Sequence, residues 1–174
     1  MLAYQRGDAG AFEVLYARHK SAAFAFLKRS GAPADVVEEL FQEAWMAIIR
    51  NIENYQPSAK FKTYLYQVAH RKLIDHWRRS REFEELDEQS LASPESETGR
   101  GALNHAEQQQ LATQLMRQLQ NLPEEQRCAV LLRQQGFTQQ EIAEITDVGA
   151  ETVKSRLRYA TKSLRDSMGG LHYG

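Results

Sequence analysis

A helix-turn-helix pattern at residues 137–165 constrains the fold of this chain more than any other feature. Thr138 and Glu141 form a T-x-x-E capping box that starts a first helix. The segment TDVG at residues 146–149 supplies a tight turn, because Asp and Gly tolerate the backbone angles that such a bend needs. In the helix that follows, apolar residues at helical spacing form one buried stripe: Val153, Leu157, Ala160 and Leu164.

The remaining surface of that second helix is mainly basic. A helix that packs on one side and carries cations on the other fits the major groove of DNA, where cations meet phosphates and polar tips reach base edges. The alternative is an ordinary amphipathic helix with a solvated charged face. The capping box, the turn and the apolar stripe in this order favour the DNA-binding interpretation.

Charge is unevenly distributed along the 174 residues, although the net charge is only −1. Residues 60–81 and 150–165 are basic, whereas residues 86–110 are acidic. Two basic surfaces separated by an acidic connector suggest two contacts with one polyanion.

Several functional classes find no support in the residues. The single cysteine, Cys128, excludes an internal disulfide, and the five histidines show no metal-ligand spacing with it or with one another. Glycine loops for phosphate binding and a Ser-His-Asp arrangement are also missing from the sequence. No apolar run approaches membrane-spanning length and no secretory signal opens the chain. We therefore expect a cytoplasmic protein that is not an enzyme, with no cofactor, no metal and no membrane insertion.

The periodicity predicts an all-α chain of two small helical domains joined by a flexible acidic linker. Residues 5–85 form the first domain, with helices expected at about residues 34–52 and 60–80 after a first helix capped by Asp8. Residues 86–109 are the linker, because their Ser, Glu, Gly and Thr cannot offset ordering entropy by burial. Residues 110–168 form the second domain, which holds the helix-turn-helix.

Four segments in this order resemble the extracytoplasmic-function sigma factors, the minimal two-domain members of the sigma-70 family. The segments are FEVLYARH, DVVEELFQEAWMAIIRN, KFKTYLYQVAHRKLIDHWRR and LPEEQRCAVLLRQQGFTQQEIAEITDVGAETVKSRLRYA. The resemblance implies a sigma factor that directs core RNA polymerase to specific promoters and initiates transcription in a stress or envelope response. It also implies an anti-sigma factor as a frequent further partner. The residues alone leave a second function open, a stand-alone helix-turn-helix regulator with a helical sensor domain, which would bind duplex DNA without polymerase.

In the family, the second helix docks on the largest catalytic subunit of RNA polymerase. The resemblance assigns this role to an acidic helical face, and carboxylates on an exposed helix suit a partner that bears arginines. The core-polymerase residues are Glu38, Glu39, Gln42 and Glu43. A merely solvated helical face is the alternative. The family motif often begins with Asp and Ala, where this chain has Val36 and Val37.

The third helix resembles the segment that melts the downstream promoter element, which requires aromatic groups beside cations. The residues assigned to this strand contact are Tyr55, Lys60, Lys62, Tyr64, Gln67, His70, Arg71 and Arg78. The family usually has Trp-Leu-Tyr-Arg where this chain has Tyr64-Leu65-Tyr66-Gln67, and for Tyr66 we expect packing in the core.

The helix-turn-helix resembles the domain that reads the upstream promoter element. The positions that match those pointing into the groove are Lys154, Ser155, Arg158 and Tyr159. The positions that match those nearer the DNA backbone are Glu151, Thr152, Arg156 and Lys162.

Overall fold

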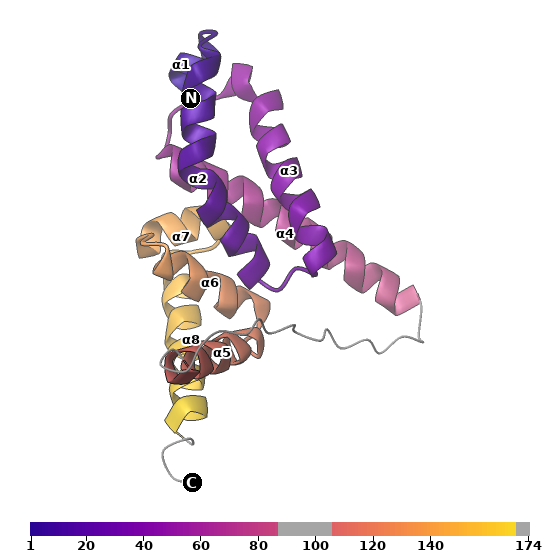
Figure 1. Cartoon of the computed structure of the whole chain (residues 1–174), viewed down its shortest axis with the longest axis vertical. Coiled ribbons are helices and arrows are strands. Elements are labelled where there is room, and N and C mark those ends of the chain that lie inside the picture. The colour runs from indigo at the N-terminus through magenta and orange to yellow at the C-terminus, as the bar shows by residue number, and fades with distance from the viewer. Residues whose placement is uncertain (87–105, 170–174) are drawn as a thin grey trace.

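The computed structural model describes residues 1–86 and 106–169, and these residues are helical with no strand. The helices, drawn in Figure 1, are α1 (Leu2–Gln5), α2 (Ala9–Arg29), α3 (Ala34–Arg50), the short 3-10 helix η1 (Ile52–Asn54), α4 (Phe61–Leu86), α5 (Ala106–Gln120), α6 (Glu124–Gln134), α7 (Gln139–Thr146) and α8 (Ala150–Gly169). The predicted fold class is confirmed. The predicted linker lies mostly outside the described residues.

In the first half of the chain, α2, α3 and α4 pack on one another. The Asp8 carboxylate caps α2, as predicted, by accepting a hydrogen bond of 3.1 Å from the Ala11 N–H. Helix α2 ends at Arg29 and the chain turns at Gly31, whose φ of 96° favours glycine. Helix α3 ends at Arg50, so Ile52 lies in η1 rather than in the predicted helix.

Helix α4 runs six residues beyond the predicted end at residue 80. Its apolar stripe ends at Trp77, but residues 81–86 contain no Gly or Pro and are mostly good helix formers. The helix therefore continues past its apolar stripe; on this extension Arg81 forms an ion pair with Glu124 of α6, and Phe83 is 70% exposed.

In the second half, the helix-turn-helix forms as predicted. Both bonds of the capping box are present: the Glu141 N–H donates to the Thr138 hydroxyl at 3.2 Å, and the Thr138 N–H donates to the Glu141 carboxylate at 2.9 Å. The turn uses only one residue with a positive φ, Asp147 at 55°. The stripe of α8 faces inward, with Val153 and Ala160 fully buried.

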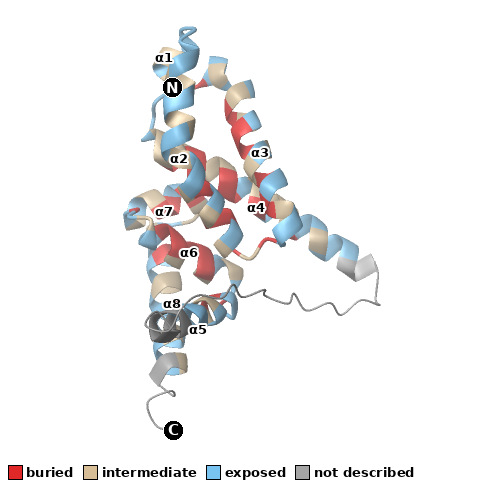
Figure 2. Cartoon of the chain, in the orientation of Figure 1, coloured by how far each residue is buried: buried red, intermediate tan, exposed pale blue. Residues whose placement is uncertain are grey.

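The two halves of the chain pack directly against each other. Figure 1 shows α7 beside α4, and α6 beside the end of α2. One continuous cluster of buried residues joins Leu65 and Tyr66 of α4 with Phe137 and Ile142 of the second half. In Figure 2 the buried positions of α4, α6 and α7 meet in this central zone. A smaller cluster around Leu122 holds α5 to α8.

None of the helices in the described ranges is both long enough and apolar enough to cross a membrane.

Candidate polymerase and nucleic-acid interfaces

The four residues predicted to bind core polymerase lie together on α3, and we call them the acidic face. Glu38, Glu39 and Gln42 are exposed, and Gln42 donates to the Glu38 carboxylate at 3.4 Å. Glu43 is less free, because it forms an ion pair of 3.1 Å with Lys72 of α4 and its side chain is 35% exposed. Three of the four side chains are therefore available to a partner.

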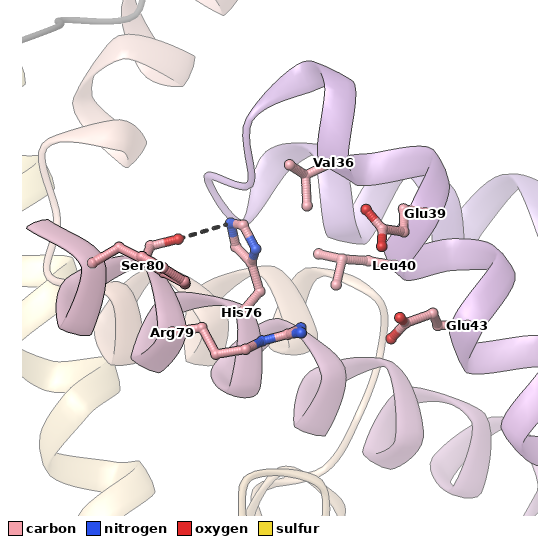
Figure 3. Close-up of a pocket in the computed structure, with 8 residues that line it drawn as sticks. Val36, Glu39, Leu40, Glu43, His76, Arg79 and Ser80 are labelled. Carbon is pink, nitrogen blue, oxygen red and sulfur yellow. Dashed lines mark hydrogen bonds between the residues drawn. The ribbon is translucent and has the colours of Figure 1, made fainter.

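A hollow of about 250 Å³ adjoins the acidic face, between the start of α3 and the end of α4. Figure 3 shows the Glu39 and Glu43 carboxylates on one wall, and His76 and Arg79 on the other. Val36, which stands where the family often has a polar residue, lines the same hollow. The hollow is therefore lined by apolar side chains together with carboxylates and two basic side chains.

The eight residues predicted for the upstream element lie on α8, and we call them the groove face. All eight are exposed or half-buried, and Tyr159 is 54% exposed. The Arg158 guanidinium lies 5.0 Å from the centre of the Tyr159 ring and donates to its hydroxyl at 3.3 Å. Lys154 forms a weak surface ion pair of 3.4 Å with Glu151. Cations and an aromatic ring are thus presented together to solvent.

The residues predicted for the downstream element, which we call the strand face, do not share one environment. Tyr55 and Tyr64 lie with ring centres 5.4 Å apart and line a second hollow of about 250 Å³. Gln67 and Thr63 also line it, and Glu144 of α7 lies at its edge. The hollow thus combines two aromatic rings, of which that of Tyr55 is buried, with polar side chains.

Helices α6 and α7 and the turn between them cover part of the strand face. The Lys62 ammonium donates to the Gln135 carbonyl at 2.6 Å and lies 4.4 Å from the centre of the Phe137 ring. The Gln67 amide donates to the Glu144 carbonyl at 3.1 Å. These two donors, predicted to touch DNA, are both occupied by main-chain oxygens of the second half.

Two further strand-face residues are involved in the same contact. Lys60 forms an ion pair of 3.1 Å with Glu141, the capping-box residue. His70 is only 7% exposed, and Arg156 of the groove face lies close enough for its charge to act on it. By contrast, Arg71 and Arg78 remain exposed.

Three groups at or beside this contact have a shifted pKa. Burial lowers the pKa of His70 to about 4, with the charges of Arg156 and Arg71 acting in the same direction. The hydrogen bond from the Thr138 N–H and the ion pair with Lys60 lower the pKa of Glu141 to about 2. Burial raises the pKa of Tyr66 to about 12. Tyr66 is fully buried and its ring meets Phe137 at 4.9 Å, so its predicted place in the core is confirmed.

A second contact between the halves involves residues that the sequence did not single out. The Arg127 guanidinium lies over Gly31, where a side chain carbon would come within 2.7 Å of it. The Cys128 thiol is fully buried close to Ser30, whose hydroxyl donates to the Phe26 carbonyl at 2.8 Å. Gln120 donates to the Arg29 carbonyl at 3.3 Å. A single arginine inside an amphipathic helix carries no signal of such a contact.

Among the described residues, no group of three or more His, Cys, Asp or Glu side chains could hold a metal ion.

An all-helical first half with an acidic face, followed by a helix-turn-helix with a basic face, defines the two-domain class of sigma-70 proteins. Residues 15–83 match the family description Sigma-70 region 2, and residues 112–164 match Sigma-70, region 4. The chain is 31% identical over 163 residues to the ECF RNA polymerase sigma factor RpoE of Cereibacter sphaeroides, covering 92% of this chain and 88% of the relative. The chain belongs to the extracytoplasmic-function sigma factors.

Other relatives agree with this membership. The ECF RNA polymerase sigma-E factor of Escherichia coli is 29% identical over 172 residues, covering 92% of this chain and 87% of that protein. Among solved structures, the fold is similar to that of the sigma factor RpoE in complex with the anti-sigma factor NepR from Bartonella quintana, with a TM-score of 0.75 and 22% identity over 91% of this chain and 97% of that chain. It is also similar to CnrH in complex with the cytosolic domain of CnrY, with a TM-score of 0.69 and 21% identity over 95% of this chain and 92% of that chain.

The protein is therefore an RNA polymerase sigma factor, which binds core RNA polymerase and promoter DNA and initiates transcription. This membership favours the sigma-factor interpretation over a stand-alone regulator.

Proposed function

We propose that the three faces divide the work of initiation. The acidic face of α3 docks on the largest subunit of core polymerase, the strand face of α4 holds the opened downstream element, and the groove face of α8 reads the upstream element. Residues 5–85 would then form the polymerase-binding and melting domain, and residues 110–168 the upstream-element domain. The carrying observation is that three side chains of the acidic face, Glu38, Glu39 and Gln42, are exposed on one helix, α3.

Complementary charge explains why the acidic face suits a protein rather than DNA. Phosphates would be repelled by Glu38 and Glu39, and no ion pair occupies either side chain among the described residues. A partner helix carrying arginines would gain charge-assisted hydrogen bonds with both carboxylates. The hollow beside Glu39 adds apolar area to the same contact.

As a member of this family, the protein is proposed to act in the cytoplasm in a stress or envelope response, without a catalytic role of its own. An anti-sigma factor is a proposed further partner. The titles of two similar solved structures support that proposal, since one names the anti-sigma factor NepR and the other the cytosolic domain of CnrY.

The charge reversal Glu39→Lys tests the docking face. Because Glu39 is exposed, the substitution should leave the fold intact, but it places like charges against the partner. We expect core affinity, measured by competition with a labelled wild-type chain, to fall on the order of tenfold. Glu13→Lys, the same reversal at an exposed position of α2, is the matched control. Equal affinity of the two variants would show that the acidic face is only solvated.

A further inference from the structure

The loop between α3 and α4 carries one wall of the second hollow. Residues 51–60, which we call the tyrosine loop, contain η1 and then run to the start of α4. The loop residues that line the hollow are Tyr55, Gln56, Ser58 and Ala59. The Tyr55 ring is only 8% exposed and lies against that of Tyr64 on α4, with ring centres 5.4 Å apart. The surroundings of the Tyr64 ring therefore depend on where the loop holds Tyr55.

A side chain from the start of the chain holds the tyrosine loop. The Gln5 amide, at the end of α1, donates to three main-chain carbonyls of this loop. The acceptors are those of Ile52 at 2.9 Å, Glu53 at 3.1 Å and Tyr55 at 3.2 Å. Among the described residues, no other hydrogen bond is seen to the Glu53 or the Tyr55 carbonyl. Because every main-chain carbonyl requires a donor, one amide supplies two groups that have no partner within the loop.

The Gln5 side chain does not serve its own helix. The first residue after α1 donates its N–H to two carbonyls of that helix, so the helix end needs no side chain. Helix α1 is in turn fixed to α2, where the Tyr4 ring lies 4.9 Å from that of Phe12. Phe12 meets the buried Trp45 of α3 with ring centres 5.7 Å apart. The donor is thus mounted on a packed aromatic cluster, and its hydrogen bonds go to the loop.

We propose that Gln5 is a positioning residue for the downstream promoter element. Its amide fixes the main chain of residues 52–55, and thereby Tyr55 and the Tyr64 ring that holds the opened strand. The proposal rests on the strand-face assignment made under Proposed function. Gln5 acts without touching a base, because its amide is taken up by the three carbonyls. A wall that is already fixed costs less ordering entropy when the strand binds, and it discriminates between bases better than a surface that can re-pack.

Two substitutions remove the donor and keep the approximate size of the side chain. Gln5→Met removes it without a change of charge, whereas Gln5→Glu places carboxylate oxygens against the three carbonyls. Gln5 is exposed and both new residues favour a helix, so the fold should remain intact. Ala9→Glu, at the exposed first position of α2, is the matched control for the added charge. Circular dichroism and thermal unfolding verify each variant.

The first measurement follows the loop in the free full-length chain. Amide hydrogen exchange of residues 54–58 reports the order of the loop, since three N–H groups of this stretch are bonded within it. For Gln5→Met and Gln5→Glu we expect exchange there to be faster on the order of tenfold, with unchanged exchange in the buried middle of α4. Ala9→Glu should exchange as the wild type does. Unchanged loop exchange in Gln5→Met would overturn the proposal.

The second measurement uses holoenzyme, in which permanganate reactivity of promoter thymines gives the opened fraction. Gln5→Met should lower this fraction on the order of fivefold for the preferred downstream element, and less for single-base variants of that element. Binding of the unopened promoter should stay as in the wild type and in Ala9→Glu. A purely structural role of Gln5 would weaken all promoters alike. An equal loss on every promoter would therefore overturn the proposal.

A double-substitution cycle tests whether Gln5 acts through the tyrosine loop. In a Tyr55→Leu background, which keeps an apolar side chain at that place, Gln5→Met should add little further loss of promoter opening. Full additivity of the two losses would overturn the proposal.

Faster loop exchange without a loss of opening would overturn the proposal too, and Tyr64→Ala then identifies the step that failed. If Tyr64→Ala impairs opening by holoenzyme, the strand-face assignment stands and the positioning role of Gln5 is wrong. If Tyr64→Ala leaves opening unchanged, the strand-face assignment is wrong and the role of Gln5 falls with it.

Discussion

The strand face of α4 and the groove face of α8 are both basic helical surfaces with aromatic residues, yet they differ in the isolated chain. Most of the groove face is exposed, and the side-chain hydrogen bond that Arg158 makes among the described residues is to its neighbour Tyr159. In the strand face, Lys62 and Gln67 donate hydrogen bonds to main-chain carbonyl oxygens of the other half. Two surfaces with similar composition can therefore differ in availability, and the difference lies in what packs on them.

The largest expected effect concerns the strand face. In holoenzyme, Tyr64→Ala should reduce promoter opening by about 1–3 kcal/mol, toward the upper end, because the ring can stack on a base and also forms a wall of the hollow. Permanganate reactivity of promoter thymines measures the opening. Tyr159→Ala on the groove face is the matched control, and it should reduce promoter binding while the opened fraction of bound promoter stays the same. If Tyr64→Ala opens promoters as well as wild type, the two faces do not differ in the proposed way.

The comparison also shows which parts of the site sequence patterns can predict. Helix periodicity and the capping box are local, so the helix-turn-helix, its buried stripe and the Asp8 cap follow from short segments. The exposure of the acidic face follows in the same way, because the opposite side of α3 is apolar. Local patterns therefore place the two faces that are mostly exposed, but they do not predict the ion pair of Glu43 with Lys72 or the approach of Arg156 to His70.

Contacts between the halves leave no such pattern. Lys62 and Gln67 look like solvent-exposed polar residues, but their partners are main-chain carbonyls, which every residue has. Arg127 lies over Gly31 because that residue has no side chain, which is apparent only when both segments are placed in space. The sequence therefore did not predict that the strand face is covered, although it named every residue assigned to that face.

Substitutions on the groove face should distinguish a side chain that reads bases from one that holds the DNA backbone. Their effect should be smaller than that of Tyr64→Ala. Arg158→Ala should lower transcription from the preferred promoter by about 1–2 kcal/mol, in the lower part of the range for a base-reading arginine, and less from mismatched promoters. Lys162→Ala should weaken all promoters alike and reduce the salt dependence by about one charge. Neither residue is buried, so the helix should survive both changes. The measurement is transcription from a panel of upstream-element variants at two salt concentrations. A uniform loss for Arg158→Ala would mean that Arg158 holds phosphate.

The smallest expected effect is the pH dependence of the free energy of unfolding that comes from the covered contact between the two halves. It distinguishes the covered strand face from the mostly exposed groove face. His70 has a pKa of about 4 in this structure, below its ordinary value of 6.5, with burial as the main cause. The unfolded chain thus binds a proton more readily than the folded one. The stability from neutral His70 is present above pH 6.5 and is lost as the pH falls toward 4.

Between about pH 8 and pH 6 we expect a loss on the order of 1 kcal/mol in the free energy of unfolding, measured by urea denaturation. The charges that face His70 are Arg71 on its own helix and Arg156 on α8, and both stay positive throughout this range. The window of Glu141 lies lower, between its ordinary 4.5 and about 2, so it does not overlap. His70→Gln should flatten the slope between pH 8 and pH 6, and His19→Gln should flatten it less, because the pKa of the half-buried His19 is lowered by a smaller degree of burial. An equal slope in wild type and His70→Gln would show that His70 becomes protonated without leaving its site, and the covered face would then tolerate a charge that burial should exclude.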